Sequence, residues 1–134
     1  MEQMATNRPR PDAAALDGAL AALAARFGNR LVTSQAVRDQ HAHTLSWLPR
    51  QPPDGVVFVQ TMADIQDAVR ICAERKVPVI PYGAGTSLEG HVNAPAGGIS
   101  IDTRDMNRLI AIHAEDLDCT IEPVAAILAR KTGR

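Results

Sequence analysis

The chain has 134 residues, of which 46% are hydrophobic and only 3% aromatic. This length suits one domain, and its core must be built from Val, Ile, Leu and Ala, a composition typical of aliphatic strands packed between helices. The formal net charge is −1, and no basic block or acidic tail is present. The charge therefore gives no reason to expect a nucleic acid partner, and an anionic ligand would have to be bound by backbone groups.

Membrane and targeting signals are absent from the pattern of apolar residues. No apolar stretch approaches the roughly 20 residues that a transmembrane helix needs, and residues 1–11 lack the hydrophobic core of a secretion signal. Cys72 and Cys119 belong to no metal-ligand or redox spacing, which favours reduced thiols. We therefore expect a cytoplasmic protein without a transmembrane segment.

The first part of the chain is predicted to be a disordered start, residues 1–11, followed by helices and a proline-rich connection, residues 12–54. Asp12 can cap a helix that Gly28 ends. One face of this helix is apolar and carries Leu16, Leu20, Leu23 and Phe27. A shorter helix is expected from residue 33 or 34 to about residue 41, before the prolines of residues 43–54 impose an extended connection.

Residues 56–81 have the most regular pattern. Residues 56–59 form an apolar run typical of a strand buried on both faces, and residues 77–81 form a second one. Between them, Thr61 and Asp64 resemble a capping box. The helix that follows has an apolar stripe made of Ile65, Ala68, Val69 and Cys72. Strand, helix and strand form a βαβ unit, which implies a parallel pair of strands.

Further strands are expected after residue 97. Residues 98–102 read as one strand, and residues 109–113 and 118–122 flank a turn and predict an antiparallel hairpin. The predicted fold class is therefore α+β, with an α/β-like βαβ unit, and residues 55–123 are expected to form one unit.

A glycine-rich loop, residues 81–90, directly follows the second strand of the βαβ unit. Ligands of open α/β sheets bind beyond the carboxyl ends of the strands, so this is the expected position of a binding loop. Gly83, Gly85 and Gly90 permit positive φ angles and close approach of a ligand to backbone N–H groups, while Thr86 and Ser87 add hydroxyl donors. The loop is therefore suited to phosphate oxygens.

Two other phosphate motifs do not fit this loop. Leu88 occupies the third glycine position of the dinucleotide fingerprint G-x-G-x-x-G, where a side chain blocks close helix–strand packing. His91 and Val92 occupy the Lys and Ser/Thr positions of a P-loop, so a triphosphate with Mg²⁺ would lack its usual ligands.

A third pattern matches. The string VPVIPYGAGTSLEGH resembles the pyrophosphate-binding loop of the FAD-linked oxidase family, which includes vanillyl-alcohol oxidase and the D-2-hydroxyacid dehydrogenases. The resemblance covers roughly residues 35–123, and "IPYGAGTSLEGHV" with "EDLDCTIEP" is most similar to the branch of cytochrome-linked D-lactate dehydrogenase and glycolate oxidase. It implies an incomplete PCMH-type FAD-binding domain, with FAD as the cofactor.

The resemblance also implies site residues. The residues expected to cradle the FAD pyrophosphate or lead into the cradle are Pro81, Tyr82, Gly83, Ala84, Gly85, Thr86, Ser87, Leu88 and Gly90. Residues 124–134 do not match the family, whose second flavin-contacting part and substrate domain have no counterpart here. No catalytic or metal-binding residue is therefore assigned, and the isolated chain is expected to bind FAD weakly and to lack dehydrogenase activity.

Two alternatives remain open. The chain could be a non-catalytic nucleotide-binding or interaction module, or it could be one half of a split enzyme whose C-terminal part is a separate chain. His41 and His43 have the spacing of a possible metal site on a strand, but no third ligand is in view.

Overall fold

The computed structural model describes residues 9–43 and 45–125, so most of the predicted disordered start and of the tail that was expected not to match the family lies outside the described residues. The helical elements are α1 (Ala13–Phe27), a 3₁₀ turn (Gly28–Arg30), α2 (Gln35–Gln40) and α3 (Met62–Glu74). The strands are β1 (Leu31–Val32), β2 (Gly55–Phe58), β3 (Val79–Tyr82), β4 (Ile99–Asp102), β5 (Leu109–His113) and β6 (Asp118–Ile121).

Four of the strands form one sheet in the order β1-β2-β4-β3, in which β2, β4 and β3 run parallel and β1 is antiparallel to β2. The helix α3 crosses between β2 and β3 as predicted, but these two strands are not neighbours, because β4 lies between them. A crossover helix sets the relative direction of two strands and leaves room for a later strand to insert. All four residues of β4 are buried, as its central position requires.

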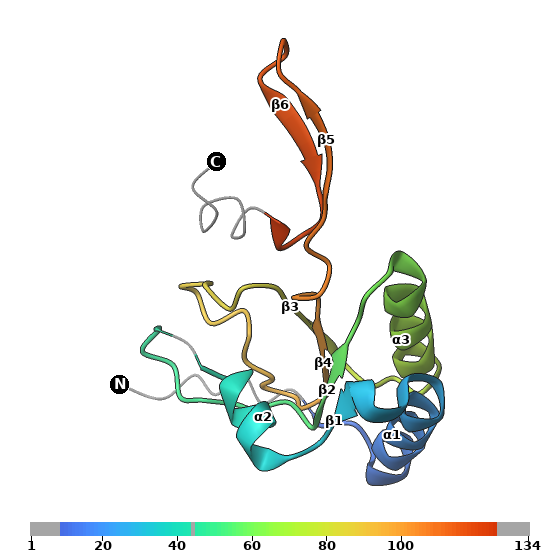
Figure 1. Cartoon of the computed structure of the whole chain (residues 1–134). Helices are drawn as coiled ribbons and strands as arrows, with labels where there is room; N and C mark the ends of the chain where they lie inside the picture. The colour runs from blue at the N-terminus through green and yellow to red at the C-terminus, as the bar shows by residue number, and fades with distance from the viewer. Residues whose placement is uncertain (1–8, 44, 126–134) are drawn as a thin grey trace.

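Helices α1 and α3 pack side by side on one face of the sheet, and α2 lies on the other side (Figure 1). The core between α1, α3 and the sheet is aliphatic. It contains Ala19, Leu23, Phe27, Val57, Val59, Ala68, Cys72, Val77, Ile99, Ile101 and Met106. Cys72 behaves as a small buried hydrophobe, and burial raises the pKa of its thiol to about 11. Val69 is wrongly placed on the apolar stripe, since it is 40% exposed.

The predicted helix-end signals hold at Thr61 and Gly28 but not at Asp12. The backbone N–H of Asp64 donates to Thr61 Oγ1 at 3.1 Å, so Thr61 caps α3. Gly28 ends α1 with a φ of 57°, and Asp12 precedes the helix without making a side-chain cap bond. Ser34 occupies the position before α2, as expected.

Asp64 also joins α3 to the end of α1 and to the 3₁₀ turn that follows it. Its carboxylate accepts from Arg30 Nη1 at 2.6 Å, from Arg26 Nη2 at 3.1 Å and from the backbone N–H of Gln60 at 3.0 Å. The hydrogen bond from Arg30 is the main cause that lowers the Asp64 pKa, against the opposing effect of burial. We call Asp64, Arg26 and Arg30 the helix clamp.

Strands β5 and β6 form the predicted antiparallel hairpin, which extends away from the rest of the molecule (Figure 1). All of its residues except Ala111 are exposed. Its exposed apolar side chains include Leu109, Ile110, Ile112, Leu117 and Ile121. Within the described ranges, no helix has the length and apolar character that crossing a bilayer requires.

Candidate functional site

The glycine-rich loop begins where β3 ends at Tyr82, at the carboxyl end of the parallel strands, and the chain then returns to start β4 at Ile99. Gly85 and Gly90 have φ angles of 70° and 73°, values that glycine adopts far more readily than other residues. Gly83 is not among the glycines with positive φ, so the expectation of a left-handed turn is wrong at that position. The left-handed backbone conformations of the loop therefore lie at Gly85 and Gly90.

Gly85 packs against Tyr82. A Cβ atom on Gly85 would overlap the Tyr82 hydroxyl oxygen and lie 2.8 Å from its Cζ atom. At Gly90, a Cβ atom would lie 2.7 Å from Leu48 Cδ1. These two glycines therefore allow the loop to contact its surroundings without side chains.

The backbone N–H groups of residues 83–90 are the main polar donors of the loop. Among the hydrogen bonds of the described residues, none is donated by a backbone amide of this segment. Gly83, Ala84, Thr86 and Leu88 are exposed, and Leu88 is 64% exposed. The Ser87 hydroxyl lies 2.9 Å from His91 Nδ1, so this predicted donor already has a neighbour. The loop presents a row of available donors, the chemistry that phosphate oxygens require.

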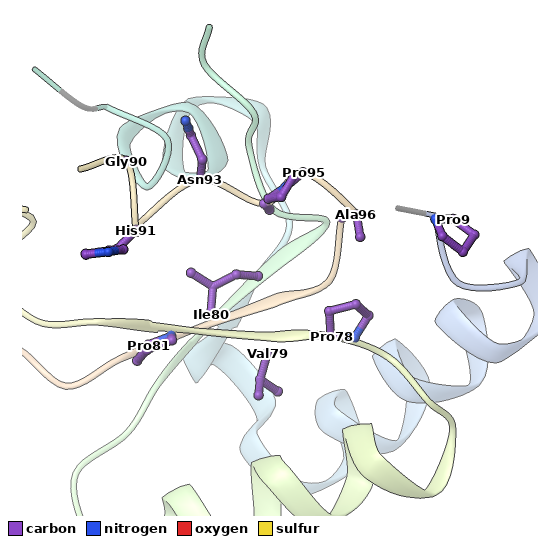
Figure 2. Close-up of a pocket in the computed structure, with 12 residues that line it drawn as sticks. Pro9, Pro78, Val79, Ile80, Pro81, Gly90, His91, Asn93, Pro95 and Ala96 are labelled. Atoms are coloured by element: carbon purple, nitrogen blue, oxygen red, sulfur yellow. The ribbon is translucent and has the colours of Figure 1, made fainter. Parts of the chain in front are cut away.

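An open cavity of about 590 Å³ adjoins the loop. Figure 2 shows the strand from Pro78 to Pro81 on one side of it and the segment from Gly90 to Ala96 on the other. Its lining is mainly apolar, and His91 and Asn93 supply polar groups. Asn93 is buried and bonded to the backbone at Pro49 and Gln51, which fixes that wall of the cavity.

A buried polar cluster that sequence reasoning missed lies beside the same strand ends. His41 Nε2 is 2.8 Å from Asp102 Oδ2, and both side chains have no exposed surface. Arg104 donates to the same carboxylate from its backbone N–H, at 2.8 Å, and from its guanidinium Nε, at 2.8 Å. His41 and Asp102 are 61 positions apart, so no local spacing could have connected them.

The metal hypothesis for His41 and His43 finds no support in this arrangement. His43 Nδ1 lies 3.1 Å from Arg50 Nη2, whereas His41 faces Asp102. Across residues 9–43 and 45–125, no group of three His, Cys, Asp or Glu side chains is placed to hold a metal ion.

We expect the chain to lose stability in acid partly through Asp102. Burial raises the Asp102 pKa, but hydrogen bonds from His41 and Arg104 outweigh it and leave the pKa lowered. A carboxyl whose pKa is lowered in the folded state stabilises that state above its unfolded pKa, and this contribution is lost as the pH falls through the folded pKa. Thermal unfolding measured from about pH 6 down to about pH 3 should therefore show a falling midpoint. The fall should be shallower in Asp102→Asn, and an identical slope in both proteins would contradict this assignment.

The comparisons with known proteins bear on the function of this loop. The probable mitochondrial D-lactate dehydrogenase of Danio rerio is 41% identical over 88 residues, which are 66% of this chain and 18% of that protein. The mitochondrial cytochrome-type D-lactate dehydrogenase of Arabidopsis thaliana is 46% identical over 71 residues, 53% of this chain and 12% of that protein. The glycolate oxidase subunit GlcD of Bacillus subtilis is 34% identical over 71 residues, 53% of this chain and 15% of that protein.

A family model described as "FAD binding domain" matches residues 53–127, more than half of the chain. The chain belongs to this family. The predicted family and cofactor are thereby confirmed. The residues of this FAD binding domain that the family model matches include the whole glycine-rich loop. The chain spans less than a fifth of the length of these curated relatives.

Solved structures confirm the fold class of this FAD binding domain. p-Cresol methylhydroxylase with bound substrate superposes with a TM-score of 0.77 at 18% identity, over 92% of this chain and 26% of that one. Alkyldihydroxyacetonephosphate synthase superposes with a TM-score of 0.74 at 19% identity, over 93% of this chain and 27% of that one. At such identities the likeness concerns the fold alone. The names of two relatives place them in mitochondria, so the expected cytoplasmic location is not confirmed.

Proposed function

We propose that this chain is the pyrophosphate-binding portion of an FAD-dependent D-2-hydroxyacid dehydrogenase acting on a substrate such as D-lactate or glycolate. The family match and the names of the relatives support the cofactor and the substrate class. The observation that carries the proposal is the row of backbone N–H groups at residues 83–90, beyond the carboxyl end of β3, that find no acceptor within the described part of the chain. A cytoplasmic location is part of the proposal.

The residues of the loop have distinct roles in this proposal. The backbone of residues 83–87 donates hydrogen bonds to the diphosphate, with Leu88 and Gly90 beside it. Pro81 and Tyr82 lead into the loop on the adenosine side, and Pro81 also lines the cavity shown in Figure 2. FAD, when bound, would accept the hydride from the hydroxy acid, and the chain would hold and orient it.

The exposed hairpin supports a role within a larger flavoprotein. Ile110 is 61% and Ile112 65% exposed, and Leu117 at the turn is 92% exposed. Apolar side chains gathered on one projecting element are typical of a surface that further polypeptide covers. In the proposal this polypeptide is the rest of the FAD-binding domain, carried by the same chain or, in the split-enzyme alternative, by a second one. The domain limits, residues 55–123 for the first part of the FAD-binding domain, belong to the same proposal.

Flavin fluorescence titration of the purified chain tests the site. We expect saturable FAD binding that Gly85→Val weakens at least about tenfold, because Gly85 has a positive φ and a side chain there would collide with Tyr82. ADP should compete with FAD better than AMP does, since AMP lacks the diphosphate. Equal affinity of Gly85→Val and the unaltered chain would contradict the assignment of the loop.

The matched control is Gly28→Val. Gly28 also has a positive φ, but it lies at the end of α1, and no heavy atom is within 4 Å of the position that a Cβ atom would take there. This variant should leave FAD affinity unchanged. The same preparations, given D-lactate or glycolate and a dye acceptor, should show no turnover. Turnover by the chain alone would show that catalytic groups are present in it, against the proposal.

A further inference from the structure

The imidazole of His41 is enclosed at the end of α2 by residues from three strands. It has no exposed surface and packs edge-on against Phe58 of β2, with ring centroids 5.9 Å apart. Its second ring neighbour is Tyr82 of β3, at 4.3 Å and an interplanar angle of 45°. Asp102 of β4 completes the enclosure. His41 therefore contacts the residue from which the glycine-rich loop departs.

The hydrogen bonds of His41 hold its ring from two sides. Nδ1 lies 2.8 Å from the carbonyl oxygen of Val37 in α2. Nε2 lies 2.8 Å from Asp102 Oδ2, and that carboxylate also receives the hydrogen bonds of Arg104. The two ring nitrogens therefore fix the imidazole between α2 and β4.

The sheet register places Tyr82 beside this pair. Phe58 and Tyr82 are both the partners of Asp102 in the parallel ladders, so the three residues form one row across the strand ends. The backbone carbonyl of Tyr82 accepts from the N–H of Thr103 at 2.9 Å. On its far end the Tyr82 hydroxyl packs against Gly85, as described above. Tyr82 is thus held between His41 and the turn of the loop.

We propose that His41 is a positioning residue that, through Tyr82, fixes the conformation of residues 83–90. Its contacts with Val37 and Asp102 hold the imidazole, the imidazole holds the Tyr82 ring, and the Tyr82 hydroxyl sets the position of Gly85. The consequence for FAD affinity rests on the proposed function of the loop, whereas the effect on the loop itself does not.

NMR of the unaltered full chain tests the two contacts. Tyr82 is the only tyrosine, so its ring signals are identified without ambiguity. We expect nuclear Overhauser contacts from the Tyr82 ring to the His41 ring and to the Gly85 α-protons. The absence of either contact would overturn the inference without any variant.

The variant His41→Gln tests the positioning effect, with His43→Gln as the matched control because His43 is exposed and faces Arg50. In folded His41→Gln, the Tyr82 ring and Gly85 amide signals should move toward their unstructured values, and the order parameters of residues 83–90 should fall. His43→Gln should keep both. Unchanged signals in a folded His41→Gln would overturn the inference.

FAD titration separates the two proposals. We expect His41→Gln to weaken FAD binding about tenfold, the order of loss that follows displacement of a positioned group, and His43→Gln to leave it unchanged. If the unaltered chain binds no FAD, the proposed function fails, and the NMR comparison still decides the role of His41. If FAD binds with equal affinity to the chain and to folded His41→Gln, the inference fails and the proposed function stands.

Discussion

Gly98→Ala should lower the free energy of unfolding by about 3 kcal/mol or more, a large part of the stability of a small domain. Gly98 has a φ of 108°, a region that residues with a side chain rarely adopt. A Cβ atom there would also collide with the carbonyl oxygen of Pro78 and lie 2.9 Å from its carbonyl carbon.

The neighbours of Gly98 have little freedom to move away. The Pro78 carbonyl accepts from the N–H of Ile99 at 2.9 Å, and Gly98 itself exchanges two hydrogen bonds with Asp54, each 2.7 Å long. Urea unfolding provides the measurement. Gly28→Ala is the control, since Gly28 also has a positive φ, 57°, but open space around it, so it should show only the backbone strain, about 2 kcal/mol. If both variants lost the same free energy of unfolding, the Pro78 carbonyl would have to move away from the new Cβ atom at little cost.

Asp64→Ala should lower the free energy of unfolding by about 2 kcal/mol through loss of the helix clamp. The Asp64 carboxylate is 7% exposed, while its partners Arg26 and Arg30 are 39% and 26% exposed. Removal of the carboxylate leaves two partly buried guanidinium groups beside each other and deprives the backbone N–H of Gln60 of its acceptor. The partial exposure of the arginines keeps the expected loss below that of a fully buried pair.

The neighbouring carboxylate of Asp67 supplies the control for the helix clamp. Asp67 pairs with Arg26 at 2.7 Å but is 23% exposed, so Asp67→Ala should cost under about 1 kcal/mol in the same urea experiment. A loss for Asp64→Ala no greater than that for Asp67→Ala would mean that the clamp contributes no more than a surface pair.

Local patterns were sufficient to predict most elements. The apolar positions Leu23 and Phe27 and the end signal Gly28 specify α1 through interactions within a few residues, and Thr61 does the same for the start of α3. The hairpin follows from two alternating segments around one turn. The glycine-rich loop could be predicted from the spacing of its glycines after a strand. Gly85 and Gly90 have positive φ angles, and such a backbone conformation depends on the residue at that position and not on distant ones.

Features that depend on distant residues could not be predicted in this way. β1 has only two residues and exists through its pairing with Val56 and Val57. Asp102 reads as the polar end of a strand, and only the register beside Phe58 and Tyr82 explains why it is buried with His41. Arg104, two residues along the chain, donates to the same carboxylate.

The position of β4 in the sheet has a consequence for folding during synthesis. β4 lies between β2 and β3 but follows both in the chain, so neither has a parallel neighbour until residues 99–102 have left the ribosome. The parallel sheet then forms in one late step that joins segments more than 40 residues apart at β2, and such non-local pairing is slow compared with helix formation. A nascent chain that ends before β4 can pair only β1 with β2, so its helical segments have no parallel sheet against which to bury their apolar faces.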